Sequence, residues 1–296
     1  MVYGKGDSTA VNLSDVANNI GGFAINGETA GDQSGYSVSA AGDVNGDGLS
    51  DLVVGAFVHS SSGGYQAGRS YVVFGGQQFA TFVDFMGSTG NDTLTGTAAS
   101  ETMVGGAGND TMTGNGGADV MYGGAGDDTL VLNASNIFKL ASAYDAADGQ
   151  IARVDGGSGF DTIQLSEGAS LDLSAIANPS VLNTTSSSRI SGVERIDLTS
   201  DIAANTLTLN ARNVADMAGM NLFNSINGSV TGGTYLFGST EARHQLLVDG
   251  NAADSVMTTG GFADSGQTAI INGHTYEVYT QGSYAQLLVE QGVIVA

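Results

Sequence analysis

The 296-residue chain has no cysteine and no unbroken apolar run of the roughly 18 residues that a membrane helix needs. Without cysteine, neither disulfides nor thiolate metal sites can stabilise the fold. This absence suits an extracellular protein held together by another kind of crosslink, and it also occurs by chance. Without the apolar run, we expect no membrane span. The first residues also lack the apolar stretch of a secretory signal. If Met1 is the native first residue, export depends on a signal elsewhere.

Basic residues are scarce, because 8 Lys and Arg stand against 30 Asp and Glu and give a formal net charge of -22. Neither a phosphate backbone nor anionic lipid headgroups attract such a polyanion, so we expect no nucleic-acid partner and no membrane-surface partner. Acidic chains are often disordered. An apolar content of 41% and repeated strand patterns argue against disorder for most of this one.

Histidine is also rare, with only His59, His244 and His274 in the chain. None of them belongs to a His-Glu-x-x-His motif, which would place two zinc ligands on one helical face. The Gly-x-Ser-x-Gly turn of serine hydrolases is missing, and no motif marks a glycosidase carboxylate pair. We therefore predict that the protein is not an enzyme.

We expect His59 and His274 at the surface. We expect Glu28 and Asp32 to be solvated loop acids.

Glycine, by contrast, is abundant, with 46 residues, and many of them recur every nine positions. Five consecutive nonapeptides and a sixth, separate copy follow the pattern Gly-x-x-Gly-x-Asp-x-apolar-x; they begin at Gly87, Gly96, Gly105, Gly114, Gly123 and Gly156. The second glycine is kept at Gly90, Gly108, Gly117, Gly126 and Gly159, with Ala99 as the one substitution. The acids are Asp92, Glu101, Asp110, Asp119, Asp128 and Asp161, and the apolar residues are Leu94, Met103, Met112, Met121, Leu130 and Ile163. A flexible linker would not keep an apolar residue in the same slot of every copy.

The nine-residue spacing has a physical reason. Six residues with two glycines make a turn whose amides and carbonyls take directions that other residues disfavour, and the last three residues make a short strand. Two nonapeptides complete one coil of a solenoid, so copies of the same parity stack about 4.8 Å apart, the spacing of paired strands. This predicts one edge lined by Asp92, Asp110 and Asp128, and another lined by Glu101, Asp119 and, after an insertion, Asp161.

Stacked carboxylates need a counter-charge, because two of them at about 5 Å repel by roughly 3 kcal/mol at an effective dielectric constant of about 20. A cation that accepts carboxylate and backbone carbonyl oxygens in flexible geometry is calcium rather than zinc or magnesium. We predict several Ca2+ ions, held by the acids and the second glycines. They are expected between Asp92 and Asp110, Asp110 and Asp128, Glu101 and Asp119, and Asp119 and Asp161. The pattern resembles the calcium-binding parallel β-roll of RTX proteins, built from hemolysin-type repeats.

A second calcium pattern is the loop Asp43-Val44-Asn45-Gly46-Asp47-Gly48-Leu49-Ser50-Asp51. Oxygen side chains at its places 1, 3, 5 and 9 and a free carbonyl at place 7 match the start of an EF-hand loop. The twelfth place holds Val54 instead of glutamate, and the flanking residues read as strands rather than helices. The candidate ligands are Asp43, Asn45, Asp47, Leu49 and Asp51.

Around this loop the chain resembles an FG-GAP repeat, the blade unit of integrin-α-like β-propellers. The matching residues are the loop itself, Gly35-Tyr36-Ser37-Val38, Leu52-Val53-Val54-Gly55-Ala56 and Tyr71-Val72-Val73-Phe74-Gly75. A propeller needs several blades to close its ring. We therefore expect this unit to be the last blade of a longer array.

Between the fifth and sixth nonapeptides, Ile137, Leu140, Ala141 and Tyr144 fall at helical spacing. With Asn133 or Ser135 as the N-cap, they predict a short amphipathic helix that covers one side of the solenoid. Later segments, at 171–173, 195–198, 207–209 and 245–248, read as strands of irregular further coils. The hairpin signal Asn272-Gly273 and strands at 285–290 and 292–295 predict an antiparallel end that caps the solenoid.

We therefore predict an all-β fold in three parts. Residues 1–80 form an antiparallel FG-GAP unit, residues 81–164 a parallel β-roll with calcium-binding turns and a helical insertion at 132–155, and residues 165–296 a β-rich capping region. This order resembles the C-terminal end of large type I-secreted bacterial adhesins. The resemblance implies a secretion signal from about residue 260 onward, the type I secretion machinery as a partner, and a place outside the cell or on its surface.

The leading function is a calcium-dependent structural and secretion module of such an adhesin, unfolded in low-calcium cytosol and folded on binding calcium outside. The alternative is a ligand-binding module for a sugar or a peptide. Its candidate contacts are the aromatic residues Tyr65, Tyr235, Phe237 and Tyr284. A third reading is a non-catalytic part of a secreted RTX enzyme.

Overall fold

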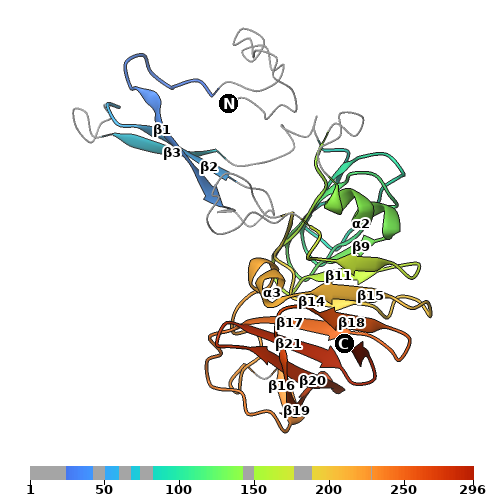
Figure 1. Ribbon diagram of the computed structural model, residues 1–296. Helices are drawn as coiled ribbons and strands as arrows, with labels where there is room; N and C mark the ends of the chain where they lie inside the picture. The colour runs from blue at the N-terminus through green and yellow to red at the C-terminus, as the bar shows by residue number, and fades with distance from the viewer. Residues whose placement is uncertain are drawn as a thin grey trace. The chain divides into compact units, whose positions relative to one another are not determined.

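The computed structural model describes residues 25–42, 51–59, 68–73, 83–142, 150–176, 189–227 and 229–296. The chain separates into two compact units, Met1–Thr81 and Phe82–Ala296. The predicted all-β class is confirmed, since strands dominate both units (Figure 1). The described residues include two short helices, both in the second unit. No helix within the described ranges has the length and apolarity to cross a membrane.

The first unit is a three-stranded antiparallel sheet in the order β1-β2-β3. Its middle strand pairs on both sides, with Val54 opposite Val38 on one neighbour and opposite Tyr71 on the other. The strands predicted on either side of the loop at 43–51 are therefore present and antiparallel. They are β1 (Ser34–Gly42), β2 (Asp51–Ala56) and β3 (Arg69–Val73).

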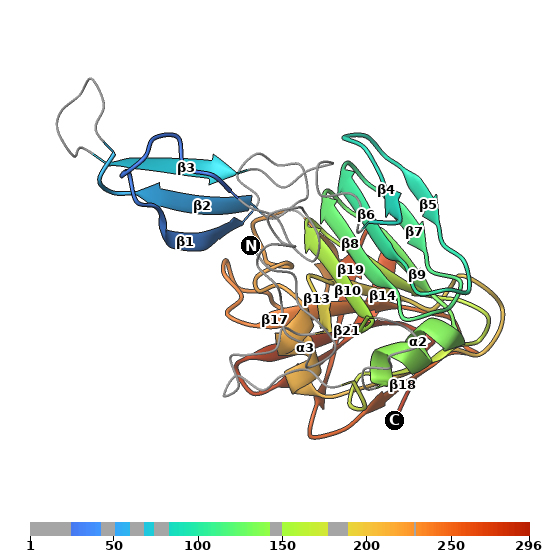
Figure 2. The same cartoon turned by 90° about the horizontal axis from the view of Figure 1, so that it is seen from above.

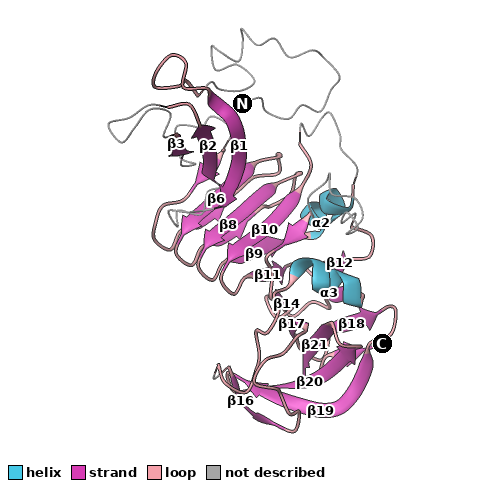
Figure 3. Ribbon diagram, turned by 90° about the vertical axis from the view of Figure 1, so that its left-hand side faces the viewer, coloured by secondary structure: helices cyan, strands magenta, loops and turns pink. Residues whose placement is uncertain are grey.

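The second unit is a solenoid (Figures 2 and 3). Strands of successive nonapeptides belong in turn to two different sheets, and within each sheet these strands run parallel. Met103 pairs with Met121 in one sheet, and Met112 pairs with Leu130 in the other. The partners are two nonapeptides apart, so two copies make one coil, as predicted. The first sheet contains β4 (Phe85–Met86), β6 (Thr102–Ala107), β8 (Val120–Ala125), β10 (Arg153–Ser158) and β13 (Ile190–Ser191). The second contains β5 (Thr93–Thr95), β7 (Thr111–Thr113), β9 (Thr129–Leu132), β11 (Thr162–Leu165), β14 (Arg195–Asp197), β17 (His244–Asp249) and β21 (Ala285–Glu290).

The coils continue beyond the nonapeptides and acquire a third parallel sheet. It consists of β12 (Ser170–Asp172), β15 (Thr206–Leu209), β18 (Ser255–Thr258) and β22 (Ile294–Val295). The antiparallel end is smaller than predicted, because β21 and β22 pair in parallel with β17 and β18. It consists of β16 (Val230–Gly233), β19 (Ala263–Ile271) and β20 (His274–Gln281), with β20 lying antiparallel to β21.

The hairpin between β19 and β20 turns at the predicted Asn272-Gly273, whose φ angles of 50° and 86° are the positive values that a two-residue hairpin turn requires. The core runs between the sheets of the solenoid. Met103, Met121 and Leu130 have no exposed surface, so the apolar slot of the nonapeptide is the core position. Each such side chain contributes roughly 1.5–3 kcal/mol by leaving water.

The two helices, α2 (Ala134–Ala141) and α3 (Ala211–Met217), begin in the same way. The Asn133 side chain accepts from the backbone N–H of Asn136, and the Asn136 side chain accepts from the N–H of Asn133. Such a reciprocal cap satisfies amides that a helix start leaves unpaired. The predicted cap Asn133 and the buried face of Ile137 and Leu140 are confirmed, whereas Tyr144 lies outside the described residues.

The place of α2 in the coil matters for the site. In the preceding coil, a six-residue turn at 114–119 joins β7 to β8, and in the next coil the segment with α2 joins β9 to β10. Because β9 pairs with β7 and β10 pairs with β8, this segment takes the place of a nonapeptide turn.

Candidate metal centre

Four acids of the nonapeptides form one column along the solenoid. The backbone N–H of Asp92 donates to Asp110 Oδ1 at 2.8 Å, and the N–H of Asp110 donates to Asp128 Oδ1 at 2.7 Å. The N–H of Asp128 donates in turn to Asp161 Oδ1 at 2.8 Å. The carboxylates of Asp110, Asp128 and Asp161 are thus each fixed by the turn of the coil before them, and each uses Oδ1 in the same way.

The position of Asp161 corrects the predicted stacking. We expected it in one column with Glu101 and Asp119, but Thr162 pairs with Thr129, which places Asp161 beside Asp128. The reason is that the α2 segment replaces a whole turn, so the sixth nonapeptide has the parity of the fifth. The prediction of an ion between Asp119 and Asp161 is therefore wrong.

Glu101 and Asp119 form a second and shorter column. The N–H of Glu101 donates to Asp119 Oδ1 at 3.0 Å, which repeats the geometry of the first column. Beyond Asp119 the pattern stops. The N–H of Arg153 donates to the carbonyl of Asp119, so the position of the next acid in this column is the residue before Arg153, which is Ala152.

Three carboxylates of the first column each keep one oxygen that no described group satisfies. Asp110 Oδ2, Asp128 Oδ2 and Asp161 Oδ2 are buried and have no hydrogen-bond partner among the described residues. Burial, helped by neighbouring carboxylates, raises the pKa of Asp128 to about 6 and that of Asp161 to about 8. Burial raises the pKa of Asp110 as well. An ionised group without a partner in such a place is costly unless a cation pairs with it.

The first glycine of each of these turns shows what surrounds the free oxygen. A Cβ on Gly105 would lie 2.4 Å from both Asp110 Oδ2 and the carbonyl oxygen of Gly123 in the next coil. A Cβ on Gly123 would lie 2.4 Å from Asp128 Oδ2 and 2.3 Å from the oxygen of Gly156. Only glycine therefore fits, and a carboxylate oxygen and a carbonyl oxygen from successive coils share one small space.

The turn of Asp161 resembles these two in its next-coil carbonyl, although the nearest atoms of the acid are carbons rather than the free oxygen. A Cβ on Gly156 would lie 2.0 Å from the carbonyl oxygen of Gly192 and 2.7 Å from the carboxyl carbon of Asp161. Carboxylate and carbonyl oxygens are the ligands that calcium prefers. Within the ranges that the structure describes, no three acidic or histidine side chains gather closely enough to hold an ion by themselves. Carbonyl oxygens would therefore supply much of the coordination, and the residues at these three turns fit calcium.

The second glycines serve the close stacking of the turns. Gly108, Gly117, Gly126 and Gly159 have positive φ angles of 106°, 87°, 123° and 145°. A Cβ on Gly126 would lie 2.3 Å from the oxygen of Gly108, and one on Gly159 would lie 2.1 Å from that of Gly126. Gly90, in the first copy, has no such close neighbour. The predicted role of these glycines as ligands stays a prediction.

In the first unit, the predicted ligands Asp43, Asn45, Asp47 and Leu49 lie outside the described residues. Asp51 begins β2, is fully buried and pairs with Gly42 at the end of β1. The loop therefore starts and ends at neighbouring positions of adjacent strands.

Two expectations about the histidines and acids of this unit need correction. His59 and Asp32 are both buried, and His59 Nδ1 lies 2.6 Å from Asp32 Oδ2. They meet because Asp32 precedes β1 and His59 follows β2, the antiparallel neighbour of β1. Glu28 is exposed and accepts a hydrogen bond from the Tyr71 hydroxyl at 2.7 Å. His274, in the second unit, is exposed as expected.

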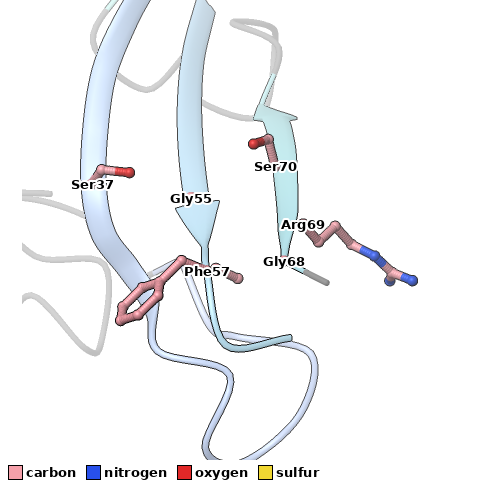
Figure 4. A pocket seen from close by; sticks show the side chains of 7 residues that line it. Ser37, Gly55, Phe57, Gly68, Arg69 and Ser70 are labelled. Carbon is pink, nitrogen blue, oxygen red and sulfur yellow. The ribbon is translucent and has the colours of Figure 1, made fainter. Parts of the chain in front are cut away.

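A pocket of about 420 Å3 lies beside β2 and β3 of the first unit (Figure 4). The Arg69 side chain extends away from the three strands there. None of the predicted metal ligands lines it; the lining residues are Ser37, Gly55, Ala56, Phe57, Gly68, Arg69 and Ser70.

Sequence reasoning missed Glu194, which ends the first column. Its Oε2 accepts from the N–H of Asp161 at 2.9 Å, and its Oε1 accepts from the N–H of Gly219 at 3.3 Å. The turn before it is too short for the nonapeptide pattern. A signal was nevertheless present, because Ile196 follows Glu194 by two places, as the apolar residue follows the acid in every copy.

Comparison with known families agrees with both repeats. Residues 84–100 and 95–130 match the RTX calcium-binding nonapeptide repeat (4 copies), and residues 34–73 match the FG-GAP repeat. The sixth copy at Gly156 and the turn of Glu194 lie outside these matches.

Comparison with curated proteins gave no match. Among solved structures, the AlgE6R3 subunit of the mannuronan C5-epimerase from Azotobacter vinelandii is 18% identical over 70% of this chain and 76% of that one, with a TM-score of 0.20. We base no argument on a similarity this low. The chain contains an FG-GAP repeat followed by RTX calcium-binding nonapeptide repeats.

Proposed function

We propose that the chain is a calcium-dependent structural module of a large bacterial surface adhesin, exported by a type I system and folded outside the cell. One observation carries the calcium part: Asp110, Asp128 and Asp161 each keep a buried carboxylate oxygen that no described group satisfies, beside a glycine turn that also faces a carbonyl oxygen of the next coil. The fold thus collects negative charge that it does not neutralise with its own described groups. At a pH where these carboxylates are ionised, we expect a cation to bind as the chain folds.

This coupling supplies a mechanism for export in an unfolded state. Cytosolic calcium is low, so the buried carboxylates oppose folding of the roll and the chain stays threadable. Extracellular calcium-binding modules work at about 10⁻⁴ to 10⁻³ M calcium, and at such concentrations binding stabilises the folded state by mass action. The RTX repeats, which are typical of type I-secreted bacterial proteins, support this location.

Circular dichroism tests the coupling. At pH 8 and about 5 mM calcium, which is above the roughly millimolar upper end of the range for extracellular modules, we expect a spectrum typical of strands. In chelator at the same pH, we expect the second unit to lose this signal. Magnesium at the same concentration serves as the control, because its smaller, octahedral site does not suit these turns. Equal strand content with calcium and with chelator would refute the proposal.

Export tests the other half of the proposal. A chain that ends before about residue 260 should stay inside cells that carry a matching type I system, while a chain that lacks residues 1–81 should still be exported. Secretion of the first variant would show that the signal lies elsewhere.

A ligand-binding module remains the second candidate, and one pocket favours it. Tyr235 and Phe237 meet edge to face with ring centroids 4.8 Å apart. Together with the highly exposed Leu236 they line a pocket of about 340 Å3 beside β16. Tyr65, proposed with them, lies outside the described residues. Binding on a glycan or peptide array that Tyr235→Ala abolishes would support this function.

A further inference from the structure

The six copies of the nonapeptide differ in whether a protein group donates a hydrogen bond to the second oxygen of the acidic side chain. We infer that calcium binds along only one side of the roll, at the turns of Asp110, Asp128 and Asp161, and that protein donors close the turns of Asp92, Glu101 and Asp119. This inference rests on the proposed calcium binding and assigns the ions to particular turns. It departs from the pattern of the sequence, which treats all six copies alike.

In the first two copies, a serine or threonine at the second place of the motif donates hydrogen bonds to the acid and satisfies its second oxygen. Ser88 donates to Asp92 Oδ2 through its N–H at 2.6 Å and its hydroxyl at 2.8 Å. Thr97 donates to Glu101 Oε2 through its N–H at 3.2 Å and to Oε1 through its hydroxyl. The third, fifth and sixth copies have glycine at this place, and their acids keep a free oxygen. A serine or threonine thus supplies within the turn what an ion would supply.

The fourth copy is closed from outside, by helix α2. Asn136 Nδ2 donates to Asp119 Oδ2 at 2.7 Å, while Asp119 Oδ1 accepts from the N–H of Glu101 at 3.0 Å. Both oxygens of Asp119 are therefore satisfied. The α2 segment replaces the next turn on this side of the roll. The position of Gly114 therefore faces the side-chain amide of Asn136, whereas that of Gly105, on the other side, faces the carbonyl oxygen of Gly123 in the next coil.

Three carbonyl groups on this side also accept hydrogen bonds from side-chain amides. Gln150 Nε2 lies 2.9 Å from the carbonyl oxygens of both Glu101 and Ala118, and Asn115 Nδ2 donates to the carbonyl of Gly96 at 3.1 Å. A Cβ on Gly114 would meet the methyl group of Met121 and the amide of Asn136, at 2.5 and 2.6 Å, instead of a glycine oxygen of the next coil. An amide donor and a methyl group do not coordinate a cation, so the turn of Asp119 does not fit calcium. At the turn of Glu101, the donors of Thr97 occupy both carboxylate oxygens.

The open side ends at Glu194, which uses both carboxylate oxygens to accept from backbone N–H groups. The column of free oxygens therefore runs from Asp110 to Asp161 and is closed at one end by Ser88 and at the other by Glu194. Three turns with a free carboxylate oxygen result, and the glycine of the last one faces the carbonyl of Gly192, outside the repeat pattern.

Anomalous scattering from crystals grown in calcium tests the assignment on the unaltered chain. We expect peaks beside the carboxylates of Asp110, Asp128 and Asp161. A peak beside Asp92, Glu101 or Asp119, or the absence of one beside any of the first three, would overturn the assignment. Crystals without any calcium peak in the roll would overturn the proposed function as well, so the two failures are distinguishable.

A matched pair of variants gives the same test in solution. Asp128→Asn and Asp119→Asn make the same change at the same motif position, one on each side of the roll. By calorimetric titration, we expect Asp128→Asn to bind at least one calcium ion fewer per chain, whereas Asp119→Asn should bind the same number as the unaltered chain. Loss of an ion from Asp119→Asn, or none from Asp128→Asn, would contradict the inference.

Discussion

The glycine at the fourth place of the nonapeptide is constrained differently from copy to copy. Gly126 has a φ of 123°, and a Cβ there would lie 2.3 Å from the oxygen of Gly108. Gly90 occupies the same place in the first copy, where the nearest atom to a Cβ is 3.9 Å away. We expect Gly126→Ala to lower the free energy of unfolding by about 1–3 kcal/mol, and Gly90→Ala to change it by less than about 0.5 kcal/mol.

Urea denaturation in saturating calcium measures both variants, and Gly90→Ala is the control for the loss of a glycine as such. Equal destabilisation by the two substitutions would show that the close stacking of the turns does not limit stability.

The buried acids predict an unusual dependence on pH when calcium is removed. The pKa of Asp128 is raised to about 6 and that of Asp161 to about 8, because burial disfavours the ionised form. A group whose pKa is higher in the folded state binds more protons there, so folded stability falls as pH rises from about 4 through these values. Protons thus replace calcium at low pH and leave at high pH.

In chelator, we therefore expect the strand signal of the second unit to be greater at pH 5 than at pH 8. Saturating calcium should remove most of this difference, since it pairs with the ionised carboxylates. Circular dichroism at both pH values checks the expectation, and a chelated protein more folded at pH 8 than at pH 5 would contradict it.

Among the elements, helix α2 shows how the insertion joins the core. Leu140 is buried within the core, whereas Phe138, two residues earlier on the same helix, is 67% exposed. We expect Leu140→Ala to destabilise the protein by about 2–4 kcal/mol through the lost contacts and the cavity, and Phe138→Ala to have little effect. Thermal denaturation in calcium compares the two variants; a larger effect from Phe138→Ala would indicate that α2 serves another surface.

The sequence predicted elements with a strict period better than it predicted their partners. The nine-residue spacing placed Met112 opposite Leu130, because two nonapeptides per coil allow only one strand register, in which residues 18 apart are neighbours. It could not place Asp161, since its stacking depends on how many turns the insertion replaces. Asn136 closes Asp119 through a contact between segments 17 residues apart, and no local pattern encodes that contact.

Helix α3 was missed for another reason. It is 7 residues long, too short for helical periodicity to be recognised. Its start, Leu209-Asn210-Ala211-Arg212-Asn213, repeats the start of α2, Leu132-Asn133-Ala134-Ser135-Asn136. Comparing the chain with itself at this point would have predicted both helices and their asparagine caps.

For the molecule as a whole, we expect calcium to be part of the folded state. The unsatisfied oxygens of Asp110, Asp128 and Asp161 are strung along one column, and each carboxylate is fixed by an N–H of the preceding turn. The ions are therefore expected to bind together with the folding of the coils rather than to a preformed chain. Folding then depends steeply on the free calcium concentration.

The most direct test is the free energy of unfolding of the second unit, measured by urea denaturation at a series of free calcium concentrations. Above the dissociation constant, each ion released on unfolding adds about 1.4 kcal/mol per tenfold rise in calcium. With three ions, we predict a rise of about 4 kcal/mol per tenfold. A free energy of unfolding that does not change with calcium would contradict the account.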